Sequence, residues 1–239
     1  MEFRDLGKQY ASMKMQIDQS IQRVLDNTNF IMGSQVGELE NTLAEYVGVK
    51  HCITCANGTD ALQLALMAWN IGTTDAVFVP DFTFFSSGEV VSAVGATPIF
   101  VDVDLNSYNI SVTSLQYMIE KVVAEGKLTP RVIIAVDLFG QPADYEAIRK
   151  LAEKYHMYIL EDGAQGFGGR IGEAKALQLL KTSKTKKGLK EATVEELAAA
   201  AKDAAAGAVL ISAVASVIIG IVILYQPAAF SAAFCCCSL

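Results

Sequence analysis

The chain has 239 residues, 52% of them hydrophobic, and a formal net charge of −7. This length suits one good-sized domain together with a smaller second one. The acidic balance, with lysines and arginines scattered through the first part, excludes the basic footprint of a nucleic-acid-binding protein.

Helix and strand patterns alternate along the first 160 residues. In chain order they predict helices at 10–26 and between 34 and 48, a strand at 51–56, a helix at 60–69, a strand at 77–79, a helix at 87–94, a strand at 97–101, a helix at 115–124, a strand at 132–136, a helix at 143–155 and a strand at 157–160. Strands rich in Val and Ile with helices between them favour a mostly parallel sheet covered on both faces. We therefore expect an α/β fold with three layers, α/β/α.

The sequence changes character after Gly172. A lysine-rich and then alanine-rich stretch is followed by residues 204–225, which carry no charge. We divide the chain into a large domain at 1–176, a basic and Ala-rich helical linker at 177–203, a hydrophobic helix at 204–225 and a Cys-containing tail at 226–239.

The hydrophobic helix is open to more than one interpretation. Its 22 residues are enough to cross a hydrocarbon core about 30 Å thick, and the lysines before it would keep its N-terminal side in the cytosol. It could instead be a buried helix, or the tail could be no natural continuation of the domain.

The N-terminus carries Glu2, Arg4 and Asp5 with no apolar run behind them, so we expect no signal peptide. The cysteines form two groups, Cys52 with Cys55 and the run 235–237, and we expect a reducing, cytoplasmic location for the folded part. His51 beside the Cys-x-x-Cys spacing suggests zinc, but residues three apart on a strand face opposite sides, so we expect no metal site.

Two groups at the carboxyl ends of the predicted strands could carry chemistry. The turn Asn57-Gly58-Thr59 opens a helix, and N–H groups at a helix N-terminus bind phosphate well; an ordinary strand-to-helix turn is the alternative. Asp162 follows the strand at 157–160, where a buried carboxylate needs a cation such as a protonated pyridine nitrogen. A helix N-cap or a surface salt bridge is the alternative for Asp162.

Aromatic residues follow the strand at 77–79. Phe82, Phe84 or Phe85 could stack on a flat cofactor ring, but aromatic side chains at such positions more often belong to the core.

Together these segments resemble the nucleotide-sugar aminotransferases of the DegT/StrS type, which have the aspartate aminotransferase fold. The resemblance extends over residues 1–176 and rests on FRDL (3–6), FIMG (30–33), NGTDAL (57–62), PDFTF (80–84), TPIFVDV (97–103), DLFGQPAD (137–144) and EDGAQ (161–165).

The resemblance implies a pyridoxal 5′-phosphate (PLP) enzyme and a role for several residues. Gly58 and Thr59 would hold the cofactor phosphate, and Phe84 would stack on the pyridine. Asp162 would keep the pyridine nitrogen protonated, and Gln165 would lie near the phenolic oxygen. The family implies transfer of an amino group from glutamate to a nucleotide-linked keto sugar, by a homodimer.

One part of the family pattern is missing. The lysine that forms the Schiff base should follow Asp162 in a segment with Ser and Pro around it, whereas Lys187 and Lys190 belong to a basic run without that motif. We transfer the catalytic role to neither lysine, so the catalytic residue is unknown, and we expect the large domain to be incomplete. A non-catalytic or membrane-anchored homologue, or an inactive fragment, remains the alternative to an active enzyme.

Overall fold

The computed structural model describes residues 5–172, 174–175, 219–225 and 229–235. Within them, a seven-stranded sheet has the order β1-β8-β9-β5-β4-β2-β3. Its strands are β1 (His51–Cys55), β2 (Asp75–Pro80), β3 (Thr97–Val101), β4 (Thr129–Val136), β5 (Tyr158–Asp162), β8 (Ile219–Tyr225) and β9 (Ala229–Cys235). All described neighbours pair in parallel except β8, which is antiparallel to both β1 and β9.

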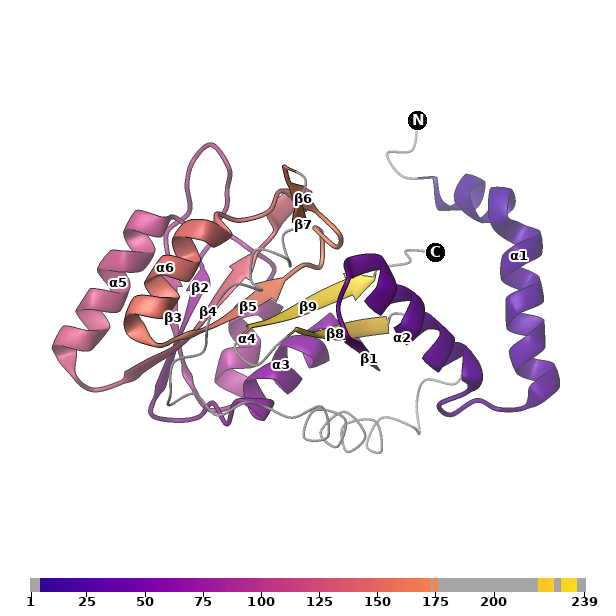
Figure 1. Cartoon of the computed structure of the whole chain (residues 1–239), viewed down its shortest axis with the longest axis horizontal. Coiled ribbons are helices and arrows are strands. Elements are labelled where there is room, and N and C mark those ends of the chain that lie inside the picture. Colours follow the sequence, from indigo (N-terminus) through magenta and orange to yellow (C-terminus); the bar gives the residue numbers. More distant parts are fainter. Residues whose placement is uncertain (1–4, 173, 176–218, 226–228, 236–239) are drawn as a thin grey trace.

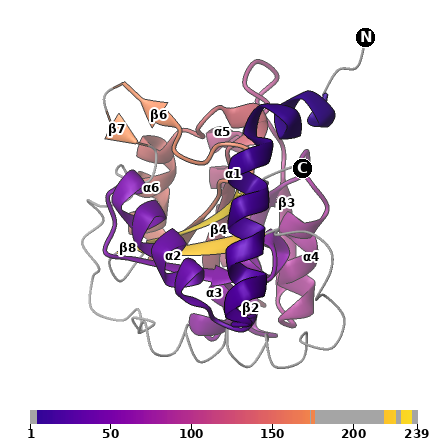
Figure 2. The same cartoon turned by 90° about the vertical axis from the view of Figure 1, so that its right-hand side faces the viewer.

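Helices cover both faces of this sheet (Figure 1). The covering helices are α2 (Ser34–Val47), α3 (Gly58–Ala68), α4 (Ser86–Ala93), α5 (Val112–Glu125) and α6 (Tyr145–Tyr155), and helix α1 (Leu6–Asn27) precedes them in the chain. One apolar cluster joins α2, α5 and α6 to the sheet, and another joins α3 and α4 to its opposite face. Figure 2 shows α6 and α4 on opposite sides of the strands. The predicted three-layer α/β/α fold is therefore confirmed.

The central strands contribute side chains to both apolar clusters, because successive side chains of a strand point to opposite faces of the sheet. On β2, Ala76 and Phe78 belong to the cluster under α5 and α6, whereas Val77 and Val79 belong to the cluster under α3 and α4. The central strands are buried on both sides, which explains their nearly continuous apolar sequence.

Local side chains set where several helices begin. Asn57, Ser111 and Asp144 each accept a hydrogen bond from a backbone N–H in the first turn, so α3, α5 and α6 start at the following residue. Gly48 and Gly126, at φ 76° and 64°, end α2 and α5 in the left-handed conformation that glycine adopts readily. These caps move the starts of α5 and α6 by a few residues from those predicted.

Helix α1 stands apart from the sheet in Figure 1 and has no buried residue. A short hairpin of β6 (Arg170–Ile171) and β7 (Ala174–Lys175), which the sequence did not predict, follows β5. None of the described helices combines the length and the apolar character that a bilayer crossing requires.

The C-terminal segment departs from the sequence-based expectation. Residues 219–225 form strand β8 rather than the end of a helix running to residue 225, and residues 229–235 of the Cys-containing tail form β9. Ile and Val dominate residues 219–224, and β-branched residues favour strands. The linker at 177–203 and residues 204–218 lie outside the described residues.

Candidate functional site

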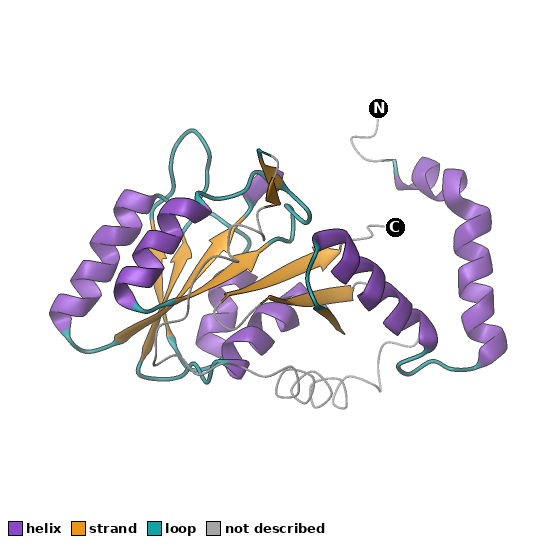
Figure 3. Ribbon diagram, in the orientation of Figure 1, coloured by secondary structure: helices purple, strands orange, loops and turns teal. Residues whose placement is uncertain are grey.

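The candidate site lies at the edge of the sheet where the parallel strands end. The loops after β1, β2, β4 and β5 leave the sheet at this edge because those strands run in the same direction. Figure 3 shows teal loops beyond the strand arrowheads. The edge gathers the turn before α3, residues 81–85, the 3₁₀ turn η1 (Leu138–Gly140) and the turn after Asp162.

Asp162 is the last residue of β5 and is buried. Its Oδ2 accepts a hydrogen bond from Ser87 Oγ at 2.8 Å, and its Oδ1 accepts from the N–H of Ala164 at 3.3 Å. Burial raises the pKa of the Asp162 carboxyl, and the donors Ser87 and Ala164 oppose that rise. No helix begins at Asp162, and none of the ion pairs among the described residues includes it. The N-cap alternative is therefore wrong, and the described residues form no salt bridge with Asp162.

Ser87 connects Asp162 to the loop after β2. This fully buried serine lies on α4, and the Thr83 hydroxyl is 3.2 Å from Ser87 Oγ. Because the single Ser87 proton is directed at Asp162, Thr83 is the donor to Ser87. Sequence reasoning missed Ser87, since nothing local to residues 86–88 indicates a partner 75 positions away.

Gly58 and Thr59 are the first two residues of α3, so the helix begins slightly before the predicted start at residue 60. The Asn57 side chain accepts from the N–H of Asp60 at 2.8 Å, and the Asn57 carbonyl accepts from the N–H of Ala61. Within the described part of the chain, these bonds leave the N–H groups of Gly58 and Thr59 for an outside acceptor. The Asp60 carboxylate is bonded to Asn57 Nδ2. Two N–H groups at a helix N-terminus suit a phosphate.

The aromatic residues after β2 are outside the core. Phe84 is 71% exposed and Phe85 76%, so the expectation that such residues belong to the core is wrong here. The loop carries them beyond the end of β2, where neither apolar cluster reaches. The Phe82 ring lies 5.8 Å from the Tyr108 ring, whose edge-on neighbour at 6.2 Å is Phe139. The ring of Phe84 is accessible to a flat ligand.

Gln165 lies in the turn after Asp162. Its Oε1 accepts a hydrogen bond from the N–H of Phe139 at 2.6 Å. A backbone N–H bonds only to the amide oxygen, so this contact fixes the amide orientation and leaves the NH₂ group of Gln165 as a donor.

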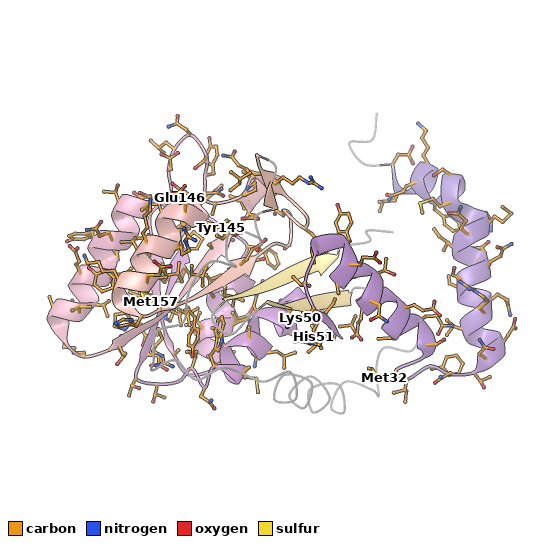
Figure 4. The ribbon with its side chains drawn as sticks, viewed as in Figure 1. Met32, Lys50, His51, Tyr145, Glu146 and Met157 are labelled. Carbon is orange, nitrogen blue, oxygen red and sulfur yellow. The ribbon has the colours of Figure 1, made fainter. Side chains whose placement is uncertain are left out.

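A second buried carboxyl stands behind the site. Asp137 Oδ1 accepts from Tyr145 Oη at 2.6 Å and from the N–H of Ala143 at 3.1 Å; Tyr145 is at the start of α6 (Figure 4). Burial raises the pKa of Asp137 to about 6, although hydrogen bonds from Tyr145, Ala143 and the Glu161 side chain lower it. A Cβ added to Gly166 would lie 2.4 Å from Asp137 Cβ, so only glycine fits there. Asp137 belongs to the DLFGQPAD motif, but the sequence pattern predicted no role for it.

His51 is exposed at the start of β1 (Figure 4), and Cys52 is buried. Burial raises the thiol pKa of both Cys52 and Cys55 to about 12, so the two thiols stay protonated at neutral pH. A protonated thiol is a poor metal ligand and a poor nucleophile.

Comparison with known proteins matches two parts of the chain to different families. Residues 11–183 match the DegT/DnrJ/EryC1/StrS aminotransferase family, and residues 189–224 match the prokaryotic diacylglycerol kinase family. The second match reaches the described residues only at 219–224, which belong to β8; the rest of this match lies outside the described residues.

Individual relatives agree with the first match. The UDP-2-acetamido-2-deoxy-3-oxo-D-glucuronate aminotransferase of Pseudomonas aeruginosa is 46% identical over 70% of this chain and 45% of its own length. A DegT DnrJ EryC1 StrS aminotransferase from Brucella abortus superposes with a TM-score of 0.69 at 49% identity, over 70% of this chain and 45% of that one. DesV from S. venezuelae, solved in complex with a ketimine intermediate, gives a TM-score of 0.66 at 34% identity, over 72% and 46%. The chain thus spans about 45% of the length of these relatives.

Proposed function

The chain belongs to the DegT/DnrJ/EryC1/StrS aminotransferase family, and from this membership we propose that residues 1–176 bind PLP as the large domain of a nucleotide-sugar aminotransferase. The observation that carries the proposal is Asp162, a buried carboxylate at the end of β5 that has no ion-pair partner among the described residues. A protonated pyridine nitrogen would supply the missing cation.

The donors and acceptors at this edge of the sheet fit the parts of the cofactor. The N–H groups of Gly58 and Thr59 suit its phosphate. The exposed ring of Phe84 suits stacking on the pyridine. The NH₂ group of Gln165 suits an acceptor such as the phenolic oxygen.

In this proposal bound PLP supplies an electron sink for moving an amino group from glutamate to a nucleotide-linked keto sugar. Asp162 holds the pyridine nitrogen protonated, and a cation there would in turn lower the pKa of Asp162. Ser87 Oγ donates to Asp162 Oδ2, and the Ala164 N–H donates to Oδ1. Both bonds favour the ionised carboxylate, which is the form that binds a protonated pyridine nitrogen. The Schiff-base lysine stays unassigned, because Lys187 and Lys190 belong to a basic run without the family motif; both also lie outside the described residues. We further propose a cytoplasmic homodimer, by analogy with the family.

The test is PLP binding to the full chain. Equilibrium dialysis should give saturable binding, and reduction with borohydride followed by mass spectrometry would locate any pyridoxyl-lysine. Asp162→Ala should weaken binding strongly, whereas Glu153→Ala, which removes an exposed carboxylate on α6, should leave it unchanged. Equal binding to wild type and Asp162→Ala would refute the proposed site.

A second candidate function is a membrane-associated protein without transaminase activity. It is favoured by the match of residues 189–224 to the prokaryotic diacylglycerol kinase family and by the absence of charge from 204 to 225. The pairing of residues 219–225 in the sheet opposes it. Flotation with phosphatidylcholine vesicles that survives alkaline carbonate, without PLP binding, would favour this candidate. Failure in both assays would leave an inactive fragment.

A further inference from the structure

Asn109 is a buried carboxamide with both ends bonded across the molecule. It lies between β3 and α5 and is 4% exposed. Its Nδ2 donates to the carbonyl of Gln141 at 2.9 Å, and its Oδ1 accepts from the N–H of Leu138 at 3.3 Å. The two bonds contact both ends of the turn at residues 138–141, which follows β4. The Asn109 side chain therefore stabilises this turn although it belongs to another loop.

This turn has a backbone that needs such support. Phe139 has φ 56° and Gly140 has φ 84°, both in the left-handed region. Glycine adopts that conformation freely, but a residue with a side chain does so at a cost in energy. The Phe139 ring is largely exposed and so contributes little packing to hold its own backbone.

The left-handed conformation directs the Phe139 N–H at Gln165 Oε1, 2.6 Å away. Gly140 also lies close to Gln165, since a Cβ at position 140 would be 3.2 Å from the Gln165 carbonyl oxygen. The conformation of the turn therefore decides whether Gln165 Oε1 can accept the hydrogen bond from the Phe139 N–H.

We propose that Asn109 is a positioning residue that holds residues 138–141 so that Phe139 fixes the Gln165 carboxamide as a hydrogen-bond donor toward the cofactor. This inference rests on the proposed PLP site for its consequence, but its structural part does not need the cofactor. Gln165 is exposed, so without this contact its amide would rotate freely and present oxygen or nitrogen alike.

The first measurement uses the full chain without cofactor. Amide hydrogen exchange of Phe139 should become about tenfold faster in Asn109→Ala, because both side-chain hydrogen bonds to the turn are lost. Gln165→Ala, a change at an exposed side chain, should speed the same amide and serves if Asn109→Ala folds poorly. Asn106→Ala is the matched control, since this asparagine is exposed on the same loop and bonds through its backbone. Unchanged Phe139 exchange in folded Asn109→Ala and in Gln165→Ala would overturn the inference.

The second measurement separates this inference from the proposed function. If PLP binds, the pH at which its phenolic group ionises, followed by absorption, should shift upward in Asn109→Ala and in Gln165→Ala. The double variant should shift no further, because both act through one contact. A shift in Gln165→Ala alone overturns the role of Asn109 while the PLP site stands. If wild type binds no PLP, the proposed function fails and the exchange rates alone decide whether Asn109 holds the turn.

Discussion

Ser87 Oγ donates a hydrogen bond to Asp162 Oδ2 at 2.8 Å, joining the first turn of α4 to the end of β5 across 75 positions of the chain. Both residues are buried. A hydrogen bond to a buried carboxylate stabilises its charged form, which burial alone disfavours. Ser87 is therefore the side chain that most directly keeps Asp162 suited to a cationic ligand.

Removing this hydroxyl should weaken PLP binding. In Ser87→Ala the pKa of Asp162 should rise further, and the affinity measured by dialysis should fall about tenfold or more, in line with the loss of a hydrogen bond to a charged group. The pH midpoint of binding should also move upward, because Asp162 would ionise only at higher pH. Ser87→Thr keeps the hydroxyl and should restore part of the affinity. Ser86→Ala, at the neighbouring buried serine, is the control; an equal effect there would point to general damage to α4.

Asp137 should make the stability of the protein depend on pH. Burial raises its pKa from 3.8 to about 6 in the folded protein, beside Tyr145, Glu161 and Asp162. A raised pKa in the folded state gives stability that is present below 3.8 and lost as the pH rises through about 6. Asp137→Asn should therefore gain on wild type over this range, by at most about 3 kcal/mol in the unfolding free energy. Urea unfolding between about pH 4 and pH 7 measures the difference.

Asp104 should make stability depend on pH in the opposite direction, because its pKa is lowered in the folded protein. Backbone N–H groups of Ser107 and Asn106 lower the pKa of this exposed carboxyl. Its contribution to stability is therefore present above the ordinary pKa and lost as the pH falls, so Asp104→Asn should gain on wild type only toward acid pH. For Asp137, the prediction is contradicted if the unfolding free energies of wild type and Asp137→Asn change with pH in the same way.

A methyl group at position 166 should destabilise the fold. The Cβ of Gly166→Ala would lie 2.4 Å from Asp137 Cβ, and the backbone of the turn after Asp162 would have to move. We expect a loss of about 1–3 kcal/mol in the unfolding free energy, as for overpacking elsewhere. Gly37→Ala is the matched change, because nothing lies within 4 Å of the added Cβ in α2, and it should be neutral or stabilising. Similar unfolding curves for the two variants would contradict the close approach.

Strand β8 should be required to hold β1 in the sheet. It pairs with β1 on one side and β9 on the other, and within the described structure β1 has no other strand neighbour. Val222→Pro removes an N–H from this pairing and should speed amide exchange in Ile53, which pairs with Val222, while β2 and β4 keep their protection. Val222→Ala keeps the N–H and should change exchange little. Unaltered exchange in β1 of Val222→Pro would show that residues 219–225 do not pair there.

Much of the fold followed from local pattern. Val- and Ile-rich segments with amphipathic helices between them predicted the layered α/β fold. The change from strand to helix near Asn57-Gly58-Thr59 was also predicted, because the Asn57 cap lies within three residues, although the helix begins at Gly58 and not at residue 60. The roles of Gly58, Thr59, Phe84, Asp162 and Gln165 came from the family resemblance and stay predictions.

The sequence by itself determined the periodicity, the caps and the residue types at the strand ends, because each depends on neighbours within a few positions. Only the tertiary structure decided that Ser87 reaches Asp162, that Asn109 grips the turn at Phe139, that Phe84 is exposed, and that residues 219–225 pair as a strand. Each of these depends on which strands become neighbours in the sheet, and that order joins segments far apart in the chain.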